Sequence, residues 1–186
     1  MEGDHAPRKR SGGGTPPGGP RGSRQSPSDW TPEEAARRVD ELAQQGHGPQ
    51  RHEGQVTPEA HARRVLDGVD PATGSAEDFA HGGQHRAPKT SSSFTSNEAY
   101  AHAESAVRNS PEFAAKASTG TPKFAVEMPL SDALGAGYRD HVFGVTKLDP
   151  RATLNTVDFT GGKVVAVYER TASGSYKLTT MYAKPR

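Results

Sequence analysis

Two neighbouring stretches near the end of the chain decide the fold: Lys163-Val-Val-Ala-Val-Tyr-Glu-Arg170 and Tyr176-Lys-Leu-Thr-Thr-Met-Tyr-Ala183. Both are rich in β-branched and aromatic residues, and the short link between them contains Gly174, which suits a hairpin loop. They predict an antiparallel pair of strands. Because side chains alternate between the two faces of a strand, those at positions 176, 178, 180 and 182 are expected on one side.

Two hydroxyl groups stand out on the second of these strands. Thr180 and Tyr182 are two residues apart, so the expected strand holds them about 7 Å from each other on a rigid backbone. The polar positions of any amphipathic strand give the same pattern. The pair therefore becomes a candidate site only together with the histidine-containing stretch far upstream.

Helix and strand signals divide the chain. Thr31-Pro-Glu-Glu34 and Thr57-Pro-Glu-Ala60 are helix starts, and Ser91–Glu98 and Ser110-Pro111 predict two more helices. From residue 123 onward the periodicity is that of strands, expected over 123–128, 141–148, 153–159 and the final hairpin. Helices gathered ahead of strands indicate an α+β domain with helices packed on an antiparallel sheet.

Composition sets the limits on function. The chain has 186 residues, no cysteine and a formal net charge of +1, which removes disulfides, thiolate nucleophiles and cysteine-based zinc sites. A near-neutral body argues against bulk binding of nucleic acid, and no DNA partner is expected. No stretch has the apolar length of a membrane span or the core of a signal peptide, so no membrane contact is expected.

The chain divides into three expected parts. Residues 1–28 are mostly Gly, Pro and Ser with five basic residues, which predicts a disordered basic tail. Residues 29–45 carry the first helix, expected as a linker, and residues 46–186 form the expected domain. Residues 67–90 show no periodicity and are expected to form a long mobile loop.

The histidine-containing stretch is Gly46-His-Gly-Pro-Gln-Arg-His-Glu-Gly54. Pro49 can open a one-turn helix that carries His52, and the next helix starts at Thr57. This corner is expected to bring a histidine close to the paired arginines at positions 63 and 64.

These segments together resemble the bacterial RNase A-like toxin domain, found at the C-terminus of contact-dependent growth-inhibition and other polymorphic toxins. The similarity rests on the order and spacing of four features, and it covers residues 46–186. They are the histidine-rich stretch 46–52, an Arg-Val pair on the following helix, Ser92-Ser-Phe-Thr-Ser96 ahead of an Ala-rich helix, and a final hairpin ending Leu178-Thr-Thr-Met-Tyr-Ala183.

The resemblance implies an RNase A-like fold, a metal-independent ribonuclease without cofactors, and a cognate immunity protein that blocks it. It implies His52, Thr180 and Tyr182 as site residues, with His47 as the alternative histidine. For the arginine, counting from His52 gives Arg63. Aligning the helix start and the following valine instead favours Arg64.

The chemistry implied is transphosphorylation of RNA to 2′,3′-cyclic phosphate ends, with tRNA as the expected substrate. His52 is the expected base for the 2′-OH, the arginine pairs with phosphate oxygens, and the two hydroxyls donate to the developing charge. The general acid stays open among three histidines: His47, His61 and His141. Such a toxin is secreted or delivered, and it acts in the cytoplasm of a target cell.

Two other classes of function fit the sequence. One is a non-catalytic α+β interaction module with a basic flexible arm, whose hairpin edge recruits a protein. The other is a metal-dependent nuclease that uses Asp78 and His81-Gly-Gly-Gln-His85, although two histidines on a Gly-rich segment make a weak metal site.

Overall fold

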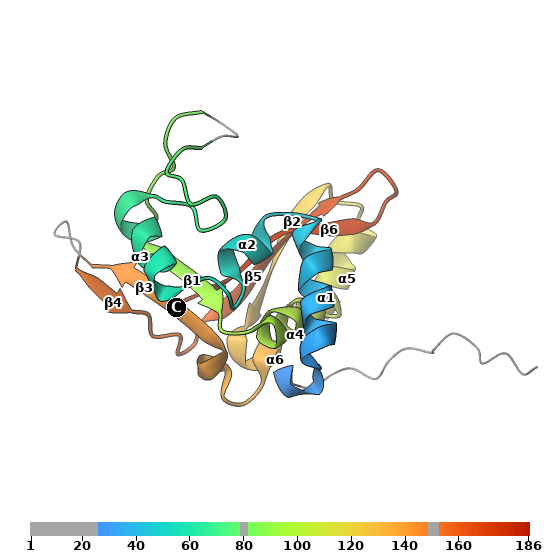
Figure 1. The fold of residues 1–186 in the computed structure, drawn as a ribbon. Helices are drawn as coiled ribbons and strands as arrows, with labels where there is room; N and C mark the ends of the chain where they lie inside the picture. The colour runs from blue at the N-terminus through green and yellow to red at the C-terminus, as the bar shows by residue number, and fades with distance from the viewer. Residues whose placement is uncertain (1–25, 79–81, 149–152) are drawn as a thin grey trace, which may run out of the picture.

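The computed structural model describes residues 26–78, 82–148 and 153–186, and it confirms an α+β fold (Figure 1). Six α-helices and six strands occur in these ranges, with most helices ahead of most strands. The helices are α1 (Pro32–Ala43), α2 (Gly48–His52), α3 (Pro58–Asp67), α4 (Asn97–Arg108), α5 (Pro111–Ser118) and α6 (Leu130–Leu134), with short 3-10 turns η1 (Pro27–Asp29) and η2 (Tyr138–His141). The strands are β1 (Thr90–Phe94), β2 (Lys123–Pro129), β3 (Val142–Lys147), β4 (Leu154–Thr156), β5 (Lys163–Arg170) and β6 (Tyr176–Lys184).

The predicted helix starts are present with the expected caps. The Thr31 hydroxyl accepts from the Glu34 amide and the Glu34 carboxylate reaches back, which completes a capping box. The Thr57 hydroxyl accepts from the Ala60 amide at the start of α3 in the same way. These caps fix where α1 and α3 begin and therefore which of their faces meet the core.

The strands form two antiparallel sheets instead of one. The first has the order β2-β5-β6 and contains the predicted hairpin, and the second has the order β1-β3-β4. In Figure 1 the β5–β6 ribbon runs from the C-terminus, beside β1 and α3, to the far end of the molecule. The end of β6 thereby reaches the β1 sheet, where α2 and α3 also lie.

A register shift in the hairpin corrects the expected grouping of side chains on β6. Val167 pairs with Thr180 but Tyr168 pairs with Leu178, so the chain bulges at Thr179. Leu178 therefore faces the core and is 1% exposed, whereas Thr180 and Tyr182 stay half-buried on the opposite side. The prediction that all four alternate residues share one face was wrong, because the extra residue reverses the alternation.

The segment around Ser91–Phe94 was predicted as the entry to a helix, and it is strand β1. Helix α4 begins later, with the Ser96 hydroxyl capping the Ala99 amide. Serine is a common helix cap, but here Ser91, Ser92 and Ser93 are buried with their hydroxyls bonded to other elements. These long-range partners override the local preference.

Helix α1 contributes to the same hydrophobic core as the rest of the domain. Its Val39 and Leu42 belong to one buried cluster with Tyr100 and Ala103 of α4 and Met181 of β6. No helix among the described residues is long and apolar enough to cross a membrane. Of the predicted tail, residues 1–25 lie outside the described part of the chain.

Candidate functional site

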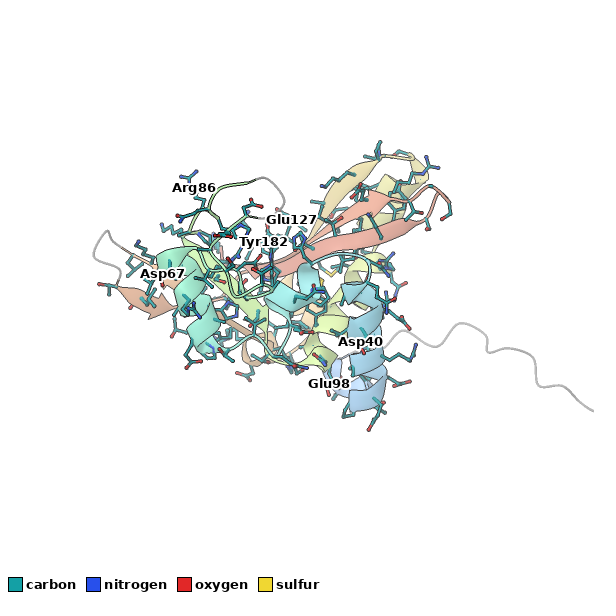
Figure 2. The ribbon with its side chains drawn as sticks, turned by 45° about the horizontal axis from the view of Figure 1, so that its top comes forward. Asp40, Asp67, Arg86, Glu98, Glu127 and Tyr182 are labelled. Carbon is teal, nitrogen blue, oxygen red and sulfur yellow. The ribbon has the colours of Figure 1, made fainter. Side chains whose placement is uncertain are left out.

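A pocket of about 330 Å³ opens where α2, α3, β1 and the end of β6 meet. All four residues favoured from the sequence line it, namely His52, Arg64, Thr180 and Tyr182. Figure 2 shows Tyr182 on β6, where that strand passes the helices of the N-terminal half. The remaining lining residues are His47, Arg51, Pro88, Thr90, Ser91, Ser92, Ala183, Lys184 and Pro185.

Two glycines let α2 approach β6 closely enough to form the pocket. A Cβ on Gly46 would lie 2.4 Å from the Thr179 carbonyl oxygen, and one on Gly48 would lie 3.0 Å from the Thr180 Cα atom. Pro49 follows at the start of α2, where its missing amide hydrogen costs no hydrogen bond. The sequence between 46 and 49 thus places a one-turn helix directly on the strand that carries the hydroxyl pair.

His52 is oriented by the backbone of β1. Its Nδ1 lies 2.6 Å from the Ser92 carbonyl oxygen, which can only accept, so Nδ1 carries the proton and donates it. Nε2 then keeps its lone pair, and the ring centroid lies 5.7 Å from that of Tyr182. Burial lowers the pKa of His52 to about 3, despite the opposing hydrogen bond to Ser92. The imidazole is therefore neutral at pH 7.

The two candidate arginines differ in placement although they are adjacent on α3. Arg64 lines the pocket and its side chain is 20% exposed, whereas Arg63 points to solvent and does not line the pocket. Consecutive residues on a helix are rotated by about 100° from each other, so only one of the pair can face β1 and β6. Burial lowers the pKa of Arg64, an effect that Asp70 opposes.

Sequence reasoning missed a carboxylate that organises the arginines. Asp70 is 1% exposed and accepts hydrogen bonds from Arg51, whose Nε lies 2.9 and 3.0 Å from the two carboxylate oxygens. Arg64 Nη1 lies 3.4 Å from Asp70 Oδ1. Burial would raise the pKa of Asp70, but the bonds from Arg51 and from the Ala72 amide hold it below its ordinary value.

No pattern in the sequence marked Asp70, because it lies in an irregular segment without periodicity. Arg51 carried a signal, since it forms the Arg-His pair with His52. Together, Arg51 and Arg64 place two guanidinium groups at one side of the pocket, with Asp70 behind them.

The three histidines considered as the general acid lie in different environments. His47 lines the pocket, and burial together with Arg51 lowers its pKa. His61 is fully buried instead, with its two ring nitrogens 2.8 and 2.9 Å from the hydroxyls of Ser91 and Ser93, and burial lowers its pKa to about 4. His141 ends η2 and does not line the pocket.

The alternative metal site can be followed only in part. His81 lies outside the described residues. His85 Nδ1 lies 3.8 Å from Asp78 Oδ2, and its Nε2 lies 3.7 Å from Asp70 Oδ2. Within the described ranges, no group of three or more His, Asp or Glu side chains is placed to hold a metal ion.

Known proteins offer a likeness in structure but no match in sequence. No family model matches the chain, and no curated protein sequence matches it. The chain is similar to a solved structure described as the CdiA-CT/CdiI complex from Y. kristensenii, with 19% identity and a TM-score of 0.42, over 75% of this chain and 100% of that chain.

Proposed function

We propose that this chain is a metal-independent ribonuclease that cleaves RNA by attack of the 2′-oxygen on the adjacent phosphorus. The observation that carries the proposal is the meeting of His52, Arg64, Thr180 and Tyr182 in one open pocket. These residues come from segments more than a hundred positions apart in the sequence. A base, a guanidinium and two hydroxyl donors suit the first step of this reaction, in which a proton is removed and negative charge grows on the phosphoryl oxygens.

The first step is removal of the 2′-OH proton. His52 Nε2 takes this proton, because Nδ1 is held as the donor to Ser92. The 2′-oxygen then bonds to phosphorus, and negative charge grows on the phosphoryl oxygens. Arg64 and Arg51 offer N–H groups to those oxygens, and a guanidinium stays charged throughout. The hydroxyls of Thr180 and Tyr182 supply further donors from rigid strand backbone.

Substrate binding strengthens the base. In the free protein, the low pKa of His52 makes it a weak proton acceptor, and the nearby Arg64 and Arg51 contribute to that. A bound phosphodiester carries a negative charge, which offsets these positive charges. Burial remains the main cause of the low pKa of His52, and the bound phosphodiester moves that pKa upward by offsetting the part that the arginines contribute.

The second step is departure of the 5′-oxygen, which needs a proton. His47 is the candidate general acid, because it lines the same pocket and its side chain reaches solvent for reprotonation. Protonated His47 donates to the leaving 5′-oxygen as the bond from phosphorus to that oxygen breaks. The products are a 2′,3′-cyclic phosphate end and a 5′-hydroxyl end.

The biological role proposed is that of a toxin. The sequence features that resemble the toxin domain of contact-dependent growth inhibition include the segments that line this pocket. The toxin would be delivered to a target cell and cleave RNA in its cytoplasm, with tRNA as the expected substrate. A cognate immunity protein would protect the producing cell by blocking the pocket.

The test is cleavage of total tRNA by the purified chain in EDTA. The expected products have 2′,3′-cyclic phosphate ends, and His52→Ala is expected to lose about 10²–10⁴-fold in rate. Arg64→Gln is expected to lose activity while the adjacent Arg63→Gln does not, which provides a matched pair on one helix. Activity that EDTA abolishes would instead indicate a metal-dependent nuclease. Intact RNA with the wild-type protein would favour the interaction module.

A further inference from the structure

A second and larger hollow adjoins the candidate site. It has a volume of about 680 Å³ and is lined by Val65, Arg86, Ala87, Pro88, Lys89, Lys147 and Leu148. Three of these seven side chains are basic and none is acidic. We call this hollow the basic groove. Its lining comes from the segment before β1, from the end of β3 and from α3.

The basic groove shares part of its wall with the candidate pocket. Pro88 lines both, and Lys89 of the groove is followed directly by Thr90 of the pocket. The Lys147 amide donates to the Lys89 carbonyl at 2.9 Å, so these two lysines lie side by side where β1 begins and β3 ends. Sheet backbone thus holds the main chain of both lysines next to the pocket, and Pro88 forms part of the wall of both hollows.

Among the described residues, the cations of the basic groove have no acidic partners. Within the described ranges, Arg86, Lys89 and Lys147 make no ion pair, whereas Lys116 and Lys163 each contact a glutamate. Arg86 and Lys89 are exposed, and Figure 2 shows Arg86 pointing away from the body of the molecule. Clustered cations without partners repel one another, so a bound polyanion would relieve a repulsion that is present in the free protein.

We infer that the basic groove is a subsite for the phosphodiester backbone of a single-stranded RNA segment next to the cleaved bond. The inference rests on the proposed ribonuclease function and deepens it. Arg86, Lys89 and Lys147 contact successive phosphates, and the apolar surface of Pro88 and Leu148 lies under the ribose and base. Leu148 is the one large apolar side chain prominently exposed among the described residues, at 59%. A groove of this kind reads backbone charge and not base sequence.

The direct test measures binding without cleavage. The probe is a fluorescent oligonucleotide of about ten nucleotides with 2′-O-methyl groups, which cannot react, and affinity is followed by anisotropy at several salt concentrations. A variant with Arg86→Gln, Lys89→Gln and Lys147→Gln removes the three charges. Loss of three phosphate contacts lowers the salt slope by about 2, so between 50 and 200 mM salt the wild type should lose roughly 16-fold more affinity than the variant.

A matched control removes three charges elsewhere. The control variant carries Arg139→Gln, Arg170→Gln and Lys177→Gln, at three residues that line neither hollow. Its affinity for the oligonucleotide is expected to depend on salt with the wild-type slope. The groove variant should also cleave a dinucleotide, which occupies the pocket alone, at the wild-type rate while it cleaves the longer RNA with a raised KM. A salt slope equal to that of the wild type overturns the subsite. Failure of the wild type to cleave any RNA refutes the ribonuclease, but the binding test of the groove still stands.

Discussion

Replacing Gly48 by alanine tests how the pocket is built. An added Cβ would lie 2.7 Å from the Tyr100 hydroxyl, 3.0 Å from the Thr180 Cα atom and 3.1 Å from the Met181 amide nitrogen. The last two are backbone atoms of β6 and cannot turn aside. Helix α2 must therefore move away from the strand, and His52 at its other end moves with it.

The size of the effect follows from two opposing contributions. Overpacking of a well-filled site costs about 1–3 kcal/mol. The gain in helix propensity from glycine to alanine is at most about 1 kcal/mol, and less at the first residue of a five-residue helix. We therefore expect the free energy of unfolding to fall by about 1–2 kcal/mol. A displacement of the base approaching 1 Å would lower the rate of tRNA cleavage by up to about 10²-fold.

The assay compares the wild type with four variants by denaturant unfolding and by tRNA cleavage. Gly74→Ala is the control, because no atom lies within 4 Å of its added Cβ and its positive φ makes the change costly only to stability. Tyr100→Phe removes the hydroxyl, which has no hydrogen-bond partner among the described residues, and should partly rescue Gly48→Ala in the double variant. Wild-type activity and stability in Gly48→Ala would refute the close approach of α2 to β6.

Three further predictions concern charge. The profile of kcat/KM against pH should be bell-shaped with its optimum below 6.5, because burial lowers the pKa of the base His52 to about 3 and lowers that of the acid His47. Asp70→Asn removes the negative charge and one of the two acceptor oxygens that face Arg51, and it should destabilise by about 3–5 kcal/mol. It should also raise KM for RNA more than it lowers kcat, since the arginines lose their alignment. Acid should destabilise the protein through His61. The pKa of a histidine is near 6.5 in the unfolded chain, whereas that of His61 in the folded protein is about 4. The unfolded chain therefore binds more protons between these values, and the free energy of unfolding decreases as the pH falls through them. His61→Gln should flatten that slope in melts recorded from pH 7 to 4.

The sequence predicted those features that local residues control. The caps at Thr31 and Thr57 and the hairpin around Gly174 were all placed correctly, because their signals lie within a few residues. The predictions that were wrong concern segments whose structure is determined by contacts with residues far away in the sequence. Ser91–Phe94 became a strand because its serines bond to α3 and β6, and the bulge at Thr179 depends on pairing with β5.

In the candidate site, too, local signals were predicted from the sequence and long-range contacts were not. Thr180 and Tyr182 were correctly predicted to lie on the same face of their strand. Strand alternation predicts that shared face, but it does not predict which face packs against the core. The choice of Arg64 over Arg63 depended on the helix start at Thr57, a local signal. Asp70 was missed because its importance comes entirely from burial beside two arginines of other elements, and its own segment carries no pattern.

One residue of β1 connects the two halves of the site. The Ser92 carbonyl accepts from His52 Nδ1 at 2.6 Å, and the Ser92 hydroxyl donates to the Ala183 carbonyl at 2.5 Å. His52, the proposed base, is thereby tied through a single backbone position to the strand that carries Thr180 and Tyr182. Because Ser92 is buried and Ala183 pairs with Val164 within the β5–β6 ribbon, this connection is braced by both sheets. A chain without disulfides can therefore hold its reacting groups in register through strand backbone alone, and that rigidity is what electrostatic stabilisation of a transition state requires.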